Sequence, residues 1–388
     1  MKEIILKAKI EGAVMFNIAD LEAHCKTLED KRGNRGKIYP LSMLVVLLIL
    51  AKLSGEDKPT GITAWVRERK EQLWRLFDWP HERMPCLNTF RTIMSEVLEA
   101  ETLEKVLVNY LHQTYGGMTS RLVTIDGKTM RGTIPKGTTR GVHLLAVYLP
   151  EEGVVLKQVL VEKKENEISA AAGLLEDVPL KGRIVCADAM QTQRDFSVDV
   201  VGGGGNYIWF VKGNQPTLLA DVEQFFKPPR RSAGWHIPSL PQTTASETSS
   251  GHGRVETRTL TLMVDSQSFL DWPALSQVFM LKREVTFTKT GKTTVEIVYG
   301  ITSCSPQEAD AQQLLQWTRH YWGIENGLHY RRDVTLNEDA TRISNRKMAA
   351  VMATLNNFLV GLTQKLGYFN LADARRVFDF QINRQLLC

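Results

Sequence analysis

Apolar residues recur at helical spacing through the first third of the chain. The segments LSMLVVLLILAKL (41–53), ITAWVRERKEQLWRLF (62–77) and LNTFRTIMSEVLEAETLEKVLVNYLHQTY (87–115) each repeat them every three or four positions. Two prolines within 78–89 separate the second predicted helix from the third. The most apolar run, 43–51, is nine residues long, whereas a membrane span needs about twenty, so we expect a buried helix. We predict an all-helical N-terminal domain over 1–118.

The pattern changes at Leu122, where short runs rich in β-branched residues begin. LVTID, VHLLAVYL, GVVLKQVLV, GRIVCAD and NYIWFVK are typical of strands, and NEISAAAGLLEDV and QTQRDFSVDVV between them are typical of helices. Three strands followed by alternating helices and strands predict a mixed α/β sheet with helices on its faces. This pattern defines the first part of a core over 119–227.

A third pattern of apolar and polar residues covers 228–305. The segments GRVETRTLTLMV, SQVFMLKREVTFTKT and KTTVEIVYGITS predict long antiparallel strands, and the Pro-, Ser- and Thr-rich stretch 228–253 predicts a loop. Helical spacing returns afterwards. We therefore expect a β-strand insertion over 228–305 and C-terminal helices over 306–388 that complete the core.

Composition narrows the function classes only slightly. The 388 residues carry a formal charge of +5, which permits a nucleic-acid partner without requiring one. The five cysteines are far apart and form no CxxC pair, so we expect reduced thiols in a cytoplasmic protein and no structural zinc site.

Two predicted apolar strands close on an acid, Asp126 and Asp188. A carboxylate in such a place costs free energy unless a lysine, an arginine or a metal ion lies beside it. Two carboxylates in one sheet repel each other unless one is protonated or a metal bridges them. Mg²⁺ commonly uses one or two carboxylates together with substrate phosphates.

A third acid, Glu325, lies in RHYWGIENGLHYRR (319–332). Helical spacing places Tyr321, Glu325, His329 and Arg332 on one face. A surface ladder of ion pairs would give the same spacing. The apolar neighbours of Glu325 favour partial burial, which suits metal and DNA binding together.

Several segments carry a more specific signal: TIDGKTMRGT, KKENEISAAAGLLEDVPLKGRIVCADAMQTQRD, YIWFVKGNQPTLL, HGRVETRTL and HYWGIENGLHYRRDVTLNEDATRI. In order and spacing they resemble DDE transposases of the IS4-like superfamily, most closely the ISAs1 (H-repeat-associated) group. The resemblance implies an RNase H-like catalytic core with Asp126 ending its first strand, Asp188 its fourth, and Glu325 on a helix after the insertion. It also implies two Mg²⁺ ions, which Mn²⁺ can replace, DNA cleavage at element ends, and strand transfer into target DNA.

One motif departs from the family pattern. Many IS4-type enzymes carry Y-x2-R-x3-E-x6-K around the glutamate, and here those positions hold Thr318, Tyr321 and Arg332. Arg332 is expected to bind phosphate in place of the lysine. Whether Arg319 or His320 replaces the missing arginine is open.

Basic and amide residues near these motifs are candidates for DNA contact. In the core and insertion they are Lys128, Arg131, Lys212, Asn214, Gln215, His252, Arg254, Arg319, His329 and Arg332, and in the basic arm 30–40 they are Lys31, Arg32, Arg35 and Lys37. Solvated turns and a solvated linker are the alternative for the exposed ones. The expected partner is double-stranded DNA, both element ends and target, bound by a homodimer, with no membrane association.

Two other functions fit the same residues. A domesticated transposase would bind DNA without cutting it, but all three acids are present. An RNase H-like nuclease would cut DNA without joining it, and its active site would look the same. A strand-transfer assay separates these possibilities.

Overall fold

The computed structural model describes residues 5–9, 15–33, 37–77, 83–161, 167–227, 241–266 and 268–386. The chain forms two compact units. The helical unit comprises Met1–Ser120, Gly127–Asn166 and Ile324–Cys388, and the sheet unit comprises Arg121–Asp126 and Glu167–Gly323. The four domain ranges expected from sequence, 1–118, 119–227, 228–305 and 306–388, stay a prediction.

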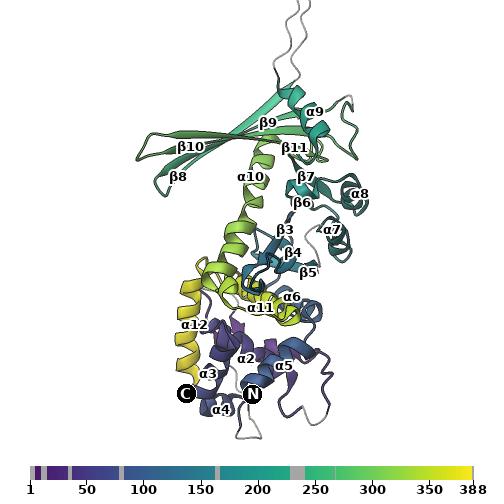
Figure 1. Ribbon diagram of the computed structural model, residues 1–388. Helices are drawn as coiled ribbons and strands as arrows, with labels where there is room; N and C mark the ends of the chain where they lie inside the picture. The colour runs from purple at the N-terminus through teal and green to yellow at the C-terminus, as the bar shows by residue number, and fades with distance from the viewer. Residues whose placement is uncertain are drawn as a thin grey trace, which may run out of the picture. The chain divides into compact units, whose positions relative to one another are not determined.

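Eight α-helices and four strands are described within the helical unit (Figure 1). The helices are α1 (Ile18–Cys25), α2 (Leu41–Leu53), α3 (Pro59–Glu68), α4 (Lys70–Phe77), α5 (Leu87–Thr92), α6 (Ala100–Tyr115), α11 (Arg346–Lys365) and α12 (Leu371–Leu386). The strands are β1 (Ile5–Leu6), β2 (Phe16–Asn17), β4 (Val142–Leu149) and β5 (Val154–Val161). The first helical segment expected from sequence is one helix, α2, but 62–77 is divided at Arg69 into α3 and α4. The third, 87–115, is interrupted at Leu98 and Glu99, before α6. The prediction of an all-helical N-terminus was wrong for β1 and β2, whose two-residue lengths are too short to show a period.

The core of the helical unit combines both ends of the chain. Every residue of α2 is buried, as expected of a helix that is apolar all round, and residues 348–363 of α11 are buried as well. Both α6 and α11 pack against β5. Lys52 of α2 and Arg375 of α12 share the buried acid Asp57, at 3.4 Å and 2.9 Å. The N-terminal helices therefore have a common core with α11, α12 and the β4–β5 pair.

The sheet unit holds a mixed sheet. Its strands are the first half of β3 (Leu122–Met130), β6 (Ile184–Ala187), β7 (Asn206–Val211), β8 (Gln242–Gly251), β9 (Arg254–Val264), β10 (Gln277–Phe287) and β11 (Thr293–Thr302). They lie in the order β3-β6-β7-β11-β10-β9-β8, parallel from β3 to β7 and antiparallel from there. Its helices are α7 (Glu167–Leu175), α8 (Arg194–Gly202), α9 (Pro216–Phe226) and α10 (Ala311–Tyr321). Figure 1 shows α10 meeting the long β8–β11 strands, and its apolar side packs on β8 and β9.

A strand longer than β1 and β2 was also missed from sequence. Residues 242–251 were predicted as a loop, but they form β8, which pairs with β9 along its whole length. Its residues are small and polar on both faces, so no apolar alternation marks it. Hydroxyl pairs such as Ser246–Thr259 at 3.1 Å and Thr248–Thr257 at 3.0 Å link it to β9 instead. His252 and Gly253, with φ of 50° and 72°, form the two-residue hairpin turn.

Within the described residues, no helix is long and apolar enough to cross a membrane.

Candidate active site

Asp126 and Asp188 occupy equivalent places on two neighbouring parallel strands. The β3–β6 ladder pairs Leu122 with Ile184 and ends with Ile125 opposite Ala187. Each aspartate is the next residue after its strand's last pair, and neighbouring strands lie about 4.8 Å apart. One sequence expectation needs correction, because β3 does not end at Asp126 but continues to Met130. What ends there is the parallel ladder, since β6 is only four residues long.

Asp188 has a local structural role as well. It is half-buried, and its Oδ1 accepts a hydrogen bond from the Met190 amide at 2.9 Å, which caps the 3₁₀ turn Ala189–Gln191. That bond uses one carboxylate oxygen and fixes the direction of the other.

Two of the amides predicted to contact DNA instead hold the turn after Asp188. Asn214 Nδ2 donates to the Ala189 carbonyl at 2.6 Å, and Gln215 Nε2 donates to the Thr192 carbonyl at 2.9 Å. They position the backbone that carries Asp188. Lys212, two residues before Asn214, is exposed.

Glu325 and His329 lie in the helical unit on an unusual helix. The segments Glu325–His329 and Arg331–Thr335 are π-helical turns, which occur frequently at functional sites. Glu325 is 56% exposed, His329 is buried, and Oε2 of the acid lies 3.8 Å from Nδ1 of the imidazole. Interaction with His329 lowers the pKa of Glu325, and burial lowers the pKa of His329. At neutral pH the pair is therefore a carboxylate beside a neutral imidazole.

Arg332 does not lie where a phosphate could reach it, which corrects the sequence expectation. Its side chain is fully buried, and its guanidinium donates to both oxygens of Glu338 at 2.8–3.1 Å. It also donates to Gln158 at 3.1 Å and to Asn357 at 3.2 Å. Helical spacing gave no sign that a buried acid six residues later would occupy the arginine.

Three further residues predicted to contact DNA are also occupied by protein. Lys128 is 8% exposed and binds Asp333 at 2.6 Å, and Arg319 is paired with Glu247 of β8. Arg32 donates to Asp30 and to the Tyr39 carbonyl. His329, also expected at the DNA, is too deeply buried to reach a duplex.

The remaining basic candidates are available to solvent. The exposed ones are Lys31, Lys37, Arg131, Lys212, His252 and Arg254. Arg35 lies outside the described residues. His252 and Arg254 flank the tip of the β8–β9 hairpin.

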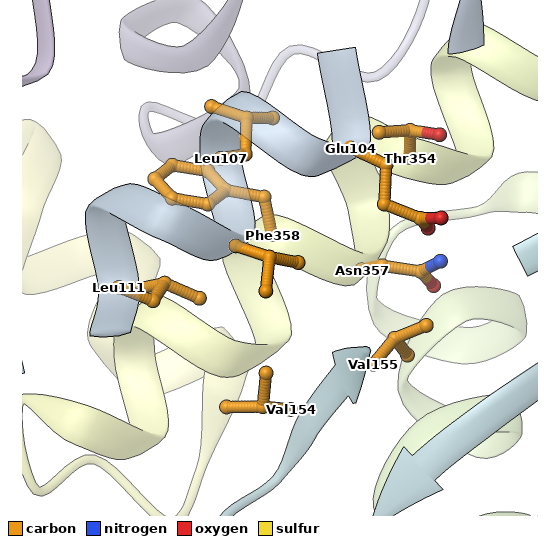
Figure 2. A pocket seen from close by; sticks show the side chains of 9 residues that line it. Glu104, Leu107, Leu111, Val154, Val155, Thr354, Asn357 and Phe358 are labelled. Atoms are coloured by element: carbon orange, nitrogen blue, oxygen red, sulfur yellow. The ribbon is translucent and has the colours of Figure 1, made fainter. Parts of the chain in front are cut away.

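Neither described cavity resembles an apolar ligand site. In the helical unit, Figure 2 shows Glu104 beside Thr354 and Asn357, at a cavity of about 10 Å³ that has room for one water. Burial raises the pKa of Glu104 to about 8. In the sheet unit, α7, α8 and Trp272 line a pocket of about 500 Å³, but the indole of Trp272 is 9% exposed and donates to Ser197, so it serves packing.

The donor chemistry of these residues fits a divalent cation. In the sheet unit, Asp126 and Asp188 present carboxylates on neighbouring parallel strands, and in the helical unit Glu325 and His329 present a carboxylate and an imidazole. Carboxylate oxygens suit Mg²⁺ and Mn²⁺, and an imidazole nitrogen suits transition metals.

The sequence matches the family described as "Transposase DDE domain" over residues 117–360, and "DDE_Tnp_1-associated" over 23–111. The chain belongs to the DDE transposase family. Among its relatives, "Putative transposase YncI" of Escherichia coli O157:H7 is 29% identical over 89% of this chain and 88% of its own. "H repeat-associated putative transposase YhhI" of Escherichia coli K12 is 25% identical over 96% and 97%. A piggyBac transposase synaptic complex with hairpin DNA aligns with a TM-score of 0.44 and 8% identity, over 96% of this chain and 79% of that one.

This family membership confirms the resemblance read from the motifs. The protein is a transposase enzyme whose substrate is DNA.

Proposed function

We propose that this transposase hydrolyses phosphodiester bonds at the ends of an insertion sequence and joins the freed 3′ ends to target DNA, using Asp126, Asp188 and Glu325 as metal ligands. The observation that carries the proposal is the register of β3 and β6. It brings two aspartates to the same point of a parallel ladder, where their charges repel unless a cation lies between them.

The strand arrangement supports an RNase H-like core. Counting from β3, Asp126 lies on the first core strand and Asp188 follows the fourth, β6, and these two strands are parallel neighbours. This is the placement that the family resemblance implied.

Two features support Glu325 as the third ligand. It is the acid that the family resemblance implies, and its side chain is 56% exposed, which leaves its carboxylate open to an ion.

Two Mg²⁺ or Mn²⁺ ions would supply activation of the attacking oxygen and stabilisation of the leaving oxygen. The protein residues supply position. The cap from Asp188 to Met190 and the bonds from Asn214 and Gln215 fix the second aspartate, and the π-turn fixes Glu325. Holding reactants in place in this way accounts for a large part of such catalysis.

The DNA partner and its setting follow from the same function. The exposed cations Lys31, Lys37, Arg131, Lys212, His252 and Arg254 are proposed to contact the backbone of element ends and target. Two ends must be joined in one event, so a homodimer is the proposed active form, acting in the cytoplasm.

The test is Asp188→Asn in the full chain. Asparagine caps helices as well as aspartate does, so the Met190 bond and the fold should persist. Cleavage of a duplex carrying candidate end sequences in Mg²⁺ should fall by at least about 10²–10³-fold. Affinity for that duplex should stay equal or rise, because a negative charge near phosphate is removed.

The control is Asp199→Asn, an exposed acid on α8, which should cleave normally. Wild-type cleavage by Asp188→Asn would reject the metal-ligand assignment. A wild-type enzyme that cuts ends but never yields joined product would identify a nuclease without strand transfer.

A further inference from the structure

The pairing of Glu325 with His329 is unlike the other acid–base pairs around it. Lys128 binds Asp333 at 2.6 Å and Arg332 binds Glu338 at 2.8 Å, both at hydrogen-bonding distance. Glu325 faces an imidazole, at 3.8 Å. The neighbouring lysine and arginine are thus committed to other acids, and the proposed metal ligand is left with a nitrogen donor.

The Glu325–His329 distance does not fit a hydrogen bond. Such bonds between nitrogen and oxygen measure about 2.7–3.2 Å. Two ligands of one ion, with bonds of about 2.1 Å, lie between about 3.0 Å apart when adjacent and about 4.2 Å apart when opposite. The 3.8 Å separation lies between these two values, so a small side-chain movement would bring the pair to either of them.

The helix geometry supports a two-ligand turn. Glu325 and His329 are the first and last residues of one π-helical segment, so both side chains leave the same turn. His329 is 8% exposed, which removes DNA contact as its role and fits the shielded position of a metal-ligating imidazole.

We propose that His329 is a nitrogen ligand of the metal ion that Glu325 binds, and that this ligand makes the ion site prefer Mn²⁺ over Mg²⁺. The proposal rests on the proposed function, since it needs a metal at Glu325. Its chemical basis is that Mg²⁺ demands oxygen ligands, whereas imidazole suits transition metals. A site with three carboxylates alone would discriminate less.

The test uses electron paramagnetic resonance of Mn²⁺ bound to the full-length protein, with and without a mixed-sequence DNA duplex. Pulsed measurements (electron spin echo envelope modulation) detect a nitrogen bonded to the ion. We expect nitrogen modulation in the wild type that changes to the ¹⁵N pattern when histidine is ¹⁵N-labelled. This readout needs neither activity nor a variant.

Variants of His329 then test whether this residue sets the preference for Mn²⁺ over Mg²⁺. His329→Gln should lose the nitrogen modulation and weaken Mn²⁺ binding by about tenfold or more. It should change Mg²⁺ affinity, measured by competition, by less than about threefold. His112→Gln, on an exposed residue of α6, should leave both affinities unchanged.

The outcomes separate this inference from the proposed function. Mn²⁺ that binds the wild type and is lost in Asp126→Asn, but shows no histidine modulation, would overturn the role of His329 and leave the three acids in place. Mn²⁺ binding that is unaffected by Asp126→Asn and Glu325→Gln, or absent altogether, would overturn both.

Discussion

At the scale of single residues, the partners of Arg332 indicate that it stabilises the fold rather than binding DNA phosphate. Its guanidinium is buried against Glu338, and removing one partner of a buried ion pair costs about 3–5 kcal/mol because the other charge is left unpaired. Arg332→Met should therefore lower the free energy of unfolding by about that amount, measured by urea denaturation. Arg376→Met, on a 71% exposed arginine, is the control and should change little.

The double variant Arg332→Met/Glu338→Leu sharpens this test. With both charges gone, much of the lost stability should return. An Arg332→Met protein with unchanged stability but a shallower salt dependence of DNA binding would restore the phosphate-binding role expected from sequence.

Glu104 should make stability depend on pH. Burial raises the pKa of its carboxyl to about 8 in the folded protein, from an ordinary value near 4.5. Between these values the folded state holds the proton more tightly than the unfolded state. The stability linked to protonation of Glu104 is therefore fully present below about pH 4.5. It is lost as pH rises to 8, and the free energy of unfolding then falls by at most about 1.4 kcal/mol per pH unit.

Glu104→Gln should remove this dependence. The side-chain amide oxygen of the variant can still accept the hydrogen bond that the backbone N–H of Gln158 donates to Glu104 at 2.7 Å. No charge then develops beside the cavity in Figure 2. Urea denaturation at pH 5 and pH 8 should show that the free energy of unfolding of the variant, relative to the wild type, is larger at pH 8 than at pH 5. Glu101→Gln, on an exposed acid of the same helix, should track the wild type, and a Glu104→Gln curve parallel to wild type would contradict the prediction.

At the scale of elements, the sequence predicted what a repeating apolar pattern can show. The buried helix α2 and the strands β3, β6 and β7 carry such patterns and were found. β8 has none, because its pairing with β9 uses hydroxyl groups. The π-turns at 325–335 also escaped, since α- and π-spacing differ little over five residues. The two aspartates were predicted, but the end of the β3–β6 ladder depends on the length of β6 rather than on β3.

Gly327 tests how tightly the π-turn is held. A Cβ on this residue would lie 2.8 Å from the hydroxyl oxygen of Tyr148, whose ring is buried in β4. Gly327→Ala should therefore displace the turn between Glu325 and His329, cost about 1–3 kcal/mol in unfolding free energy, and reduce cleavage.

Removing the clashing oxygen gives the matched control. In Tyr148→Phe/Gly327→Ala the nearest atom would be ring carbon Cζ at 3.7 Å, an ordinary contact. Stability and cleavage should both recover relative to Gly327→Ala, with Tyr148→Phe alone as reference. No recovery would show that the glycine is needed for another reason.

At the scale of the whole molecule, the N-terminal helices cannot be removed as a module. α2 and α6 share one core with α11 and α12, and Asp57 binds both Lys52 and Arg375 inside it. A fragment starting at residue 119 would expose the buried length of α11. We expect it to lack the near-ultraviolet circular dichroism and the cooperative urea transition of the full chain. A cooperative transition in the fragment would show that the core does not depend on these helices.

DNA recognition by the N-terminal region must therefore be tested in the full chain. Phosphate contacts hold any duplex, so selection of element ends needs contacts to base edges or DNA shape, and the helical region with its basic arm is the proposed reader. Lys31 and Lys37 are the exposed cations of the described arm. In Lys31→Gln/Lys37→Gln the slope of log affinity against log salt should fall by about 1.8 if both contact phosphate. End and random duplexes should weaken equally, because neither contact reads sequence.

The matched control is Lys105→Gln/Lys347→Gln, which removes the same charge from exposed positions on α6 and α11 that are not proposed to contact DNA. It should leave the salt slope unchanged, because that slope depends on the charges that contact phosphate and not on the net charge of the protein. Equal slopes in the two double variants would show that the arm is a solvated linker. A selective loss of preference for element ends in the Lys31/Lys37 variant would show instead that the arm reads bases, and that the specificity of this transposase begins there.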